Sequence, residues 1–448
     1  MYLLIAKQFI RSKVVQLSLL LLLALGIMSV LIGKQFLQKQ ERTLANVTQH
    51  QQAHIARNVE LHREIGLLLY YLRFTLIDKP DRIAGLSIGQ RDVNPSVQSI
   101  TIRTLEAQLH DTDLNNPSNL QSGNLDLGFV IIYLFPLVVI AFLFNLLSEE
   151  KEAGTWRLIA VQSNSTLRFL WMKLSVRMLL TYCMLGGILL FAYLILSLPV
   201  NRQLITFILV AILYTTFWFA FCFWVVSFQQ NSSFNALTLL SAWLILAVLL
   251  PASVNNYVAN LYPVPESLAA MVKQREGYHE KWDTDKKITM DKFYTHYPQF
   301  KKYGVPQETF NWTWYYAMQQ MGDDESLKER MAMRAKIKQR ENASRWLATA
   351  IPTMHTQLLF NDIARTSLSS HLQLLDQTTE FHERLRLYFY PKIFENAPVK
   401  SEDWKKFKPE YTRAENNINI MFALLPLFLL TFGLASWGVF NFRKTNDA

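Results

Sequence analysis

The chain has 448 residues, of which 51% are hydrophobic, 13% aromatic and only 18% charged. This composition is too apolar for an ordinary soluble domain and indicates a membrane protein. The formal net charge of +10 does not indicate a nucleic-acid partner, because the surplus of basic residues lies in one part of the chain. Outside two long polar segments, 34–127 and 255–417, the chain holds 11 basic and only 4 acidic residues. A surplus of basic residues beside apolar runs is the positive-inside pattern of membrane proteins.

Residues 1–13 have apolar side chains at helical spacing with Lys7, Arg11 and Lys13 between them. This pattern predicts an amphipathic elbow helix that lies in the headgroup region, although an ordinary basic flank explains it equally well. No small-residue cleavage site follows the next apolar run before Lys34, so we expect an uncleaved anchor.

Runs of roughly 20 apolar residues are long enough to cross about 30 Å of hydrocarbon as helices. The chain has six of them, and they predict spans at residues 14–33, 128–147, 174–200, 204–228, 234–254 and 418–442. Both termini, including the tail 443–448, are then cytoplasmic. The lack of targeting segments favours a bacterial inner (cytoplasmic) membrane.

Two long polar segments, 34–127 and 255–417, fall on the outer side and predict a large periplasmic or extracellular domain. Residues 35–76 are compatible with one helical stalk, and the proline- and glycine-containing stretch 80–124 predicts turns. Residues 323–346 and 355–389 each predict a long helix. We therefore expect an all-α membrane protein whose two insertions pack together into one mainly helical exported domain.

Two spans contain a proline near the middle, Pro136 and Pro426, which predicts kinks and released backbone carbonyls. Span 204–228 is rich in aromatic residues, among them Trp218 and Trp224. These four residues are candidates for a substrate pathway. Equally, proline is simply tolerated in membrane helices, and lipid-facing packing or an interfacial belt explains the aromatic residues as well.

Familiar enzyme and metal motifs are missing from the sequence: there is no P-loop, H-E-x-x-H, C-x-x-C or G-x-S-x-G. Both cysteines, Cys183 and Cys222, lie in predicted spans. His50 and His54 are four residues apart and could share a helix face, but no third metal ligand is identifiable. We expect neither a catalytic site nor a metal or cofactor bound by this chain itself.

The polar segment 148–173 between the second and third spans has an unusual density of acids, with Glu149, Glu150 and Glu152 followed by Gly154 and Thr155. Ser148 could cap a short helix whose first turn is acidic, as the helix dipole favours. An ordinary cytoplasmic loop is the alternative.

This segment resembles the intracellular loop of ABC-2 type transporter permeases. The matching residues are Phe142, Glu150, Glu152, Gly154, Thr155, Leu158, Ile159, Ser163, Ser165 and Lys173. The six spans and the elbow helix are similar to that family too. The two large insertions look most like a subgroup with an extended exterior domain, DUF3526-like and akin to gliding-motility and copper-maturation permeases.

The resemblance implies a permease subunit that dimerises with a second copy or a paralogue and docks separate ABC ATPase subunits, which would bind the ATP and Mg²⁺. It implies that Glu149, Glu150, Glu152, Gly154, Thr155 and Lys173 couple the ATPase to substrate export or to force transmission. The alternative is a non-transporting membrane scaffold whose exported domain binds an envelope partner.

Overall fold

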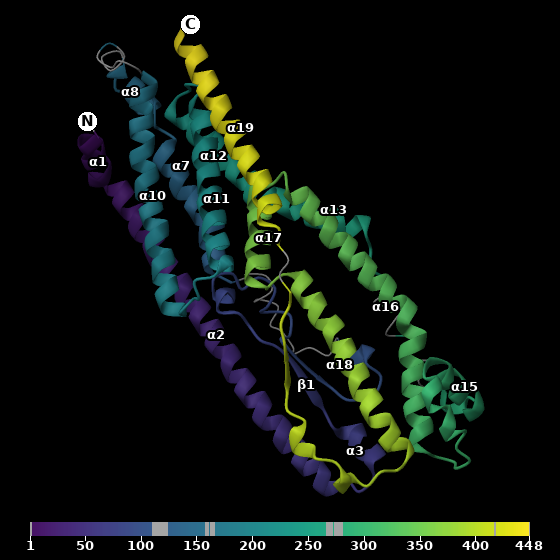
Figure 1. Ribbon diagram of the computed structural model, residues 1–448. Helices are drawn as coiled ribbons and strands as arrows, with labels where there is room; N and C mark the ends of the chain where they lie inside the picture. The colour runs from purple at the N-terminus through teal and green to yellow at the C-terminus, as the bar shows by residue number, and fades with distance from the viewer. Residues whose placement is uncertain are drawn as a thin grey trace.

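The computed structural model describes residues 2–109, 124–156, 161, 166–265, 272, 281–415 and 418–447. They are mainly helical, and among them are six helices long and apolar enough to cross a membrane. The molecule is elongated, with these spans gathered at the end that holds both termini (Figure 1).

The spans overlap the predicted apolar runs, and most of them are longer. They are α2 (Lys13–Leu61), the segment Leu127–Glu152, α10 (Thr166–Leu196), α11 (Arg202–Val226), the segment Ser232–Leu261 and α19 (Ile420–Asp447). The segment Leu127–Glu152 contains α6 (Leu127–Phe129), the π-helix η2 (Val130–Leu134), α7 (Phe135–Leu143) and α8 (Ser148–Glu152). The segment Ser232–Leu261 contains α12 (Ser232–Leu244), the π-helix η3 (Ile245–Leu249) and α13 (Leu250–Leu261). The short α1 (Tyr2–Arg11) precedes them.

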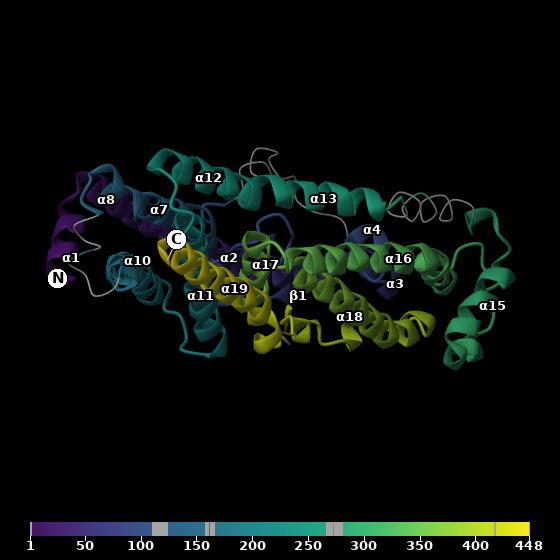
Figure 2. The ribbon, with the colours of Figure 1, turned by 90° about the horizontal axis from the view of Figure 1, so that it is seen from above.

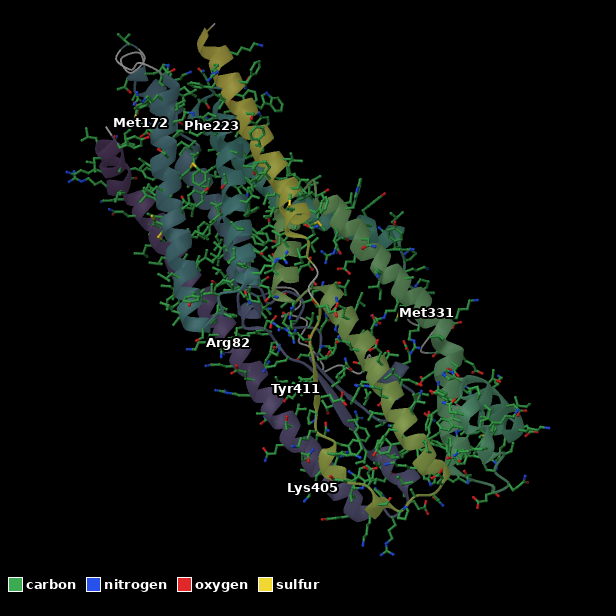
Figure 3. The ribbon with its side chains drawn as sticks, viewed as in Figure 1. Arg82, Met172, Phe223, Met331, Lys405 and Tyr411 are labelled. Atoms are coloured by element: carbon green, nitrogen blue, oxygen red, sulfur yellow. The ribbon has the colours of Figure 1, made fainter. Side chains whose placement is uncertain are left out.

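Short links and small residues hold the spans together. Asn201 and Asn231 begin α11 and α12, where each side-chain oxygen accepts from a backbone N–H three residues on, at 3.0 and 2.8 Å. Gly438 lets α19 approach α11, since an added Cβ would lie 2.9 Å from the Phe223 ring. Figure 3 labels Phe223 within this part of the bundle.

The remaining described elements form a second unit, the insertion domain, comprising residues 62–109 and 281–415. Its first segment holds α3 (Ile65–Tyr71), β1 (Phe74–Asp78), η1 (Arg82–Gly85), β2 (Val97–Ile100) and α4 (Glu106–Leu109). Its second segment holds α15 (Lys286–His296), η4 (Pro298–Tyr303), α16 (Trp312–Ala348), α17 (Pro352–Ala364), α18 (Leu368–Phe394), η5 (Val399–Ser401), η6 (Trp404–Lys406) and β3 (Glu410–Thr412).

The two segments share one hydrophobic core, in which Leu68 and Phe74 pack with Tyr316, Phe389 and Tyr390. A three-stranded sheet in the order β2-β1-β3 joins them, with β1 antiparallel to β2 and parallel to β3. The expectation of a purely α-helical chain is therefore wrong in this respect, because the stretch read as stalk and turns contains two strands.

Two predicted helices have different bounds in the structure. Residues 35–76 do not form one stalk, because α2 ends at Leu61 and the chain then turns into α3 and β1. Residues 355–389 are divided between α17 and α18, since Arg365 adopts a left-handed conformation with φ of 57°. The helix predicted at 323–346 is confirmed as part of the longer α16.

One element of the insertion domain, α17, is packed among the spans. The Phe360 ring stacks on Phe207 of α11 with centroids 4.1 Å apart, and the His355 imidazole lies 2.7 Å from the Ala423 carbonyl of α19. Figures 1 and 2 both place α17 beside α11 and α19. The insertion domain is therefore joined to the spans through more than its covalent connections.

Candidate functional site

The acidic segment forms α8, a five-residue helix at the end of the bundle where both termini lie (Figure 1). Its neighbours are α10 and the start of α12. Leu158, Ile159, Ser163 and Ser165, which also carried the resemblance, lie outside the described residues.

Glu150 fastens α8 to α10. One of its carboxylate oxygens accepts from the Lys173 ammonium at 2.8 Å, and the other accepts from the Thr155 hydroxyl. The Glu150 side chain is 21% exposed and that of Lys173 only 9%. Because this pair is shielded from water, its electrostatic attraction is screened less than that of a surface pair. The structure thus brings together three of the predicted site residues.

Glu152 joins α8 to α12 instead. Its carboxylate accepts from the backbone N–H of Ser232 at 2.9 Å, at the first residue of α12. This N–H has no partner within its own helix, and a carboxylate there also suits the helix dipole. Lys151 adds a second link by donating to the Gln229 side chain at 2.6 Å.

Ser148 does not cap α8, contrary to the prediction. Leu147 occupies the capping position, and the Ser148 hydroxyl lies 2.7 Å from the Ser232 hydroxyl. Ser148 is 2% exposed, so packing against α12 determines its orientation.

Other residues form the outward-facing surface of the segment. The Glu149 side chain is half exposed, and its one ion pair within the described part of the chain is a distant contact with Arg177 at 4.0 Å. Gly154 has φ of +73°, which favours glycine, and no atom of the described residues lies within 4 Å of the place a Cβ would take. Among the described residues, Glu149 and Gly154 therefore form the open surface of the segment, whereas Glu150 holds the segment in place.

Arg177, Asn235 and Phe9 also belong to the site and were missed from the sequence. Arg177 and Asn235 donate to the carbonyls of Phe142 and Phe144, which lie at the end of α7. The Arg177 guanidinium also lies over the Phe9 ring of α1 at 5.0 Å. The spacing of Lys173 and Arg177 by four residues at the mouth of a span could have indicated a shared face.

Pro136 and Trp218 lie inside the bundle. Pro136 follows η2 and cannot donate to the Ile132 carbonyl, which instead accepts from the Tyr214 hydroxyl of α11 at 2.8 Å. This agrees with the predicted release of a carbonyl. Trp218 is fully buried and packs edge-on against Tyr214 and Phe221.

Trp224 belongs to the contact between α11 and α19, and Pro426 lies within α19. The Trp224 ring lies 5.2 Å from that of Trp437, and Pro426 is half-buried within α19. The four pathway candidates thus lie on three different spans and do not meet at one cavity among those found in the described residues. A role in a pathway stays a prediction.

The histidine pair predicted on the stalk does lie on α2, where the His54 ring nitrogen is 3.1 Å from the Tyr71 carbonyl. In the part of the chain that the structure describes, no group of three His, Cys, Asp or Glu side chains is placed to hold a metal ion.

Residues 268–412 match the family model DUF3526, a domain of unknown function. The match begins shortly before the second segment of the insertion domain, includes α17 and covers less than half of the chain. The chain thus combines this domain with six candidate spans. No curated protein and no solved structure matches it.

Proposed function

We propose that the chain is the membrane subunit of an ATP-driven transporter of the ABC-2 type, and that α8 receives the movement of a separate cytoplasmic ATPase. The observation that carries this proposal is the position of α8, which is tied to α10 through Glu150 and to α12 through Glu152. A partner that displaces α8 would move two spans together.

On this proposal both termini and α8 face the cytoplasm, and the insertion domain is exported into the periplasm of a bacterial envelope. A second copy or a paralogue completes the transporter. ATP and Mg²⁺ are held by the ATPase subunits, because the sequence lacks a P-loop. The work done is export of a substrate or transmission of force to the insertion domain.

The test is ATPase stimulation in a complex purified with the P-loop ATPase encoded next to this chain. Glu149→Lys should abolish docking, because it reverses the charge of the open surface. Glu150→Gln should preserve docking but lower stimulation to the level of the ATPase alone, because it weakens the contact between α8 and α10. Glu60→Lys is the matched control, since Glu60 is an exposed carboxylate near the far end of α2.

Normal stimulation in both α8 variants would contradict the proposal, and so would the absence of any neighbouring P-loop ATPase. That second outcome would favour the alternative, a membrane scaffold whose insertion domain binds an envelope partner. The contact of α17 with three spans is compatible with this alternative too, because it anchors the insertion domain firmly.

A further inference from the structure

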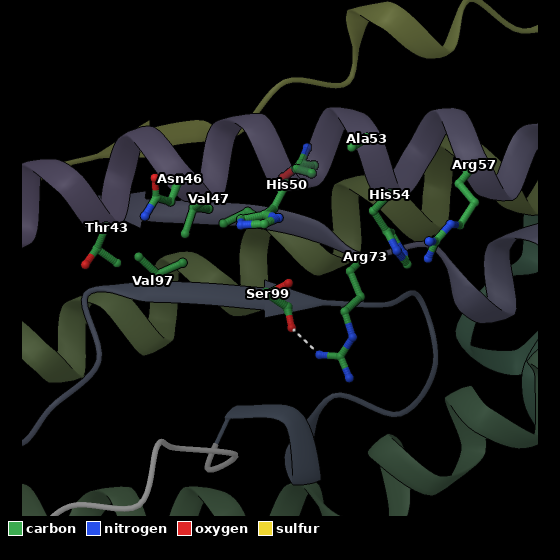
Figure 4. Close-up of a pocket in the computed structure, with 12 residues that line it drawn as sticks. Thr43, Asn46, Val47, His50, Ala53, His54, Arg57, Arg73, Val97 and Ser99 are labelled. Atoms are coloured by element: carbon green, nitrogen blue, oxygen red, sulfur yellow. Dashed lines mark hydrogen bonds between the residues drawn. The ribbon is translucent and has the colours of Figure 1, made fainter.

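A cavity of about 620 Å³ lies between α2 and the sheet of the insertion domain (Figure 4). One wall is α2 from Thr43 to Arg57, and the other is formed by residues of β1 and β2 together with Arg73. Its volume is in the range of small-molecule sites. The wall on α2 begins about 15 Å beyond residue 33, the end of the predicted apolar run, at 1.5 Å per helical residue.

The sheet turns its two faces to different surroundings. Thr75 pairs with Ser99, so Thr75, Val97 and Ser99 share the face that lines the cavity. The alternate residues Phe74 and Ile100 belong to the hydrophobic core. The face towards the cavity is mixed, with Thr75 3% exposed and Val97 and Ser99 half-buried.

The charged side chains among the described lining residues are the two arginines, Arg57 and Arg73. Arg57, Arg73, His50 and His54 line the cavity, and none of its described lining residues is acidic. Figure 4 shows the two arginines coming from opposite walls. The Arg73 guanidinium donates to the Ser99 carbonyl at 3.1 Å and keeps further N–H groups for another acceptor.

These arginines differ from others in the same domain. Arg91, Arg365 and Arg386 each lie within 3.0 Å of an aspartate carboxylate. Within the described ranges, neither Arg57 nor Arg73 has a carboxylate within 4.0 Å. Two unpaired guanidinium groups that line one cavity favour an anion that both can bind.

Gln51 is a buried side chain of the lining. Gln51 is 6% exposed, and its amide group donates to the Phe407 carbonyl at 3.0 Å. Its Oε1 atom is buried and has no hydrogen-bond partner among the described residues. Because this atom is closed off from the cavity, a ligand bound there gains no hydrogen bond from it.

We propose that this cavity binds a phosphate ester, with the phosphate at Arg57 and Arg73. Phosphate matches guanidinium donors from two directions, because it has several acceptor oxygens. Such a group could belong to a soluble polyol phosphate or to a lipid headgroup. The site does not depend on the ATP-driven function proposed above.

The experiment measures binding to the full chain in detergent by titration calorimetry, with glycerol 3-phosphate, dihexanoyl phosphatidylglycerol and glycerol as probes. We expect at least one of the two phosphate esters to bind and glycerol not to bind. Tighter binding of the lipid identifies a headgroup as the ligand, and tighter binding of glycerol 3-phosphate identifies a soluble ester.

Arg57→Gln and Arg73→Gln should each weaken binding by about tenfold or more, as expected for loss of a charge-assisted hydrogen bond. Arg42→Gln is the matched control, because Arg42 is exposed on α2 outside the cavity. Both arginines of the cavity are exposed, so their substitution should leave folding intact, which gel filtration and thermal melting verify. Failure of both esters to bind, or equal binding by all three variants and the wild type, would overturn the proposal.

Discussion

Near each of two prolines in the span bundle, a backbone carbonyl accepts a hydrogen bond from a side chain that is distant in the sequence. Pro136 leaves the Ile132 carbonyl to the Tyr214 hydroxyl, and Pro251 follows η3, where the Leu246 carbonyl accepts from Thr353. In hydrocarbon an unpaired carbonyl costs several kcal/mol, so such donors stabilise the broken helices.

We expect Tyr214→Phe to lower the free energy of unfolding by about 1 kcal/mol, because it leaves the Ile132 carbonyl without its donor. Thermal melting in detergent measures the effect. Tyr182→Phe is the control, since its partner Thr216 also donates to the Ile212 carbonyl and is not left unpaired. Equal melting temperatures for the Tyr214 variant and the wild type would contradict the prediction.

Glu402 joins the segment after α18 to that helix. Its carboxylate accepts from Lys392, Lys406 and the Tyr388 hydroxyl, and its side chain is 4% exposed. Burial alone would raise the pKa of Glu402. The hydrogen bonds from Lys392 and Lys406 outweigh this effect and lower the pKa to about 2. A lowered carboxylate pKa stabilises the fold above the pKa of the unfolded chain, and this contribution is lost as pH falls towards 2.

We therefore expect Glu402→Gln to destabilise the protein by about 2 kcal/mol at pH 7, the size of a charged hydrogen bond. The difference from wild type should shrink as pH falls from about 4.5 towards 2. Unfolding followed across this pH range is the measurement. Glu410→Gln, which removes an exposed pair with Arg384, should cost less than about 1 kcal/mol, and an equal effect of both variants would refute the assignment.

Among the elements, the spans were predictable because a run of apolar residues long enough to cross a bilayer can adopt few other structures. The strands were not, because β1 reads FTLID and β2 only VQSI, which is too short for a clear alternation. β3 lies more than 300 residues from β1 in the sequence, so its pairing depends on tertiary contacts.

The acidic helix α8 was also predictable from its residues, but the partners of its side chains were not. The contact of Glu152 with Ser232 joins residues 80 positions apart, and that of Ser148 with Ser232 joins residues 84 apart. Such pairs depend on how α12 packs beside α7, which no local pattern encodes. The sequence therefore indicated which residues form the segment, and the structure shows which of them face inward.

Across the whole molecule, a series of contacts connects α8 to the insertion domain. α8 contacts the start of α12 through Glu152, and the continuation of that span contacts α17 through Thr353. At the far end of α17, the Ser87 hydroxyl donates to Asn361 at 2.8 Å. Contiguity alone does not demonstrate coupling, which requires a perturbation at one end and a response at the other.

Thr353→Val tests this connection, because valine keeps the shape of threonine and removes the donor to the Leu246 carbonyl. On the proposed function, the variant should keep ATPase docking and stimulation while the ATP-dependent change in hydrogen exchange of α17 and α18 is lost. Thr349→Val is the matched control, since the Thr349 hydroxyl is exposed and donates only within its own turn. If exchange in α18 responds to ATP equally in both variants, movement reaches the insertion domain by another route, and α17 then serves only to anchor it to the spans.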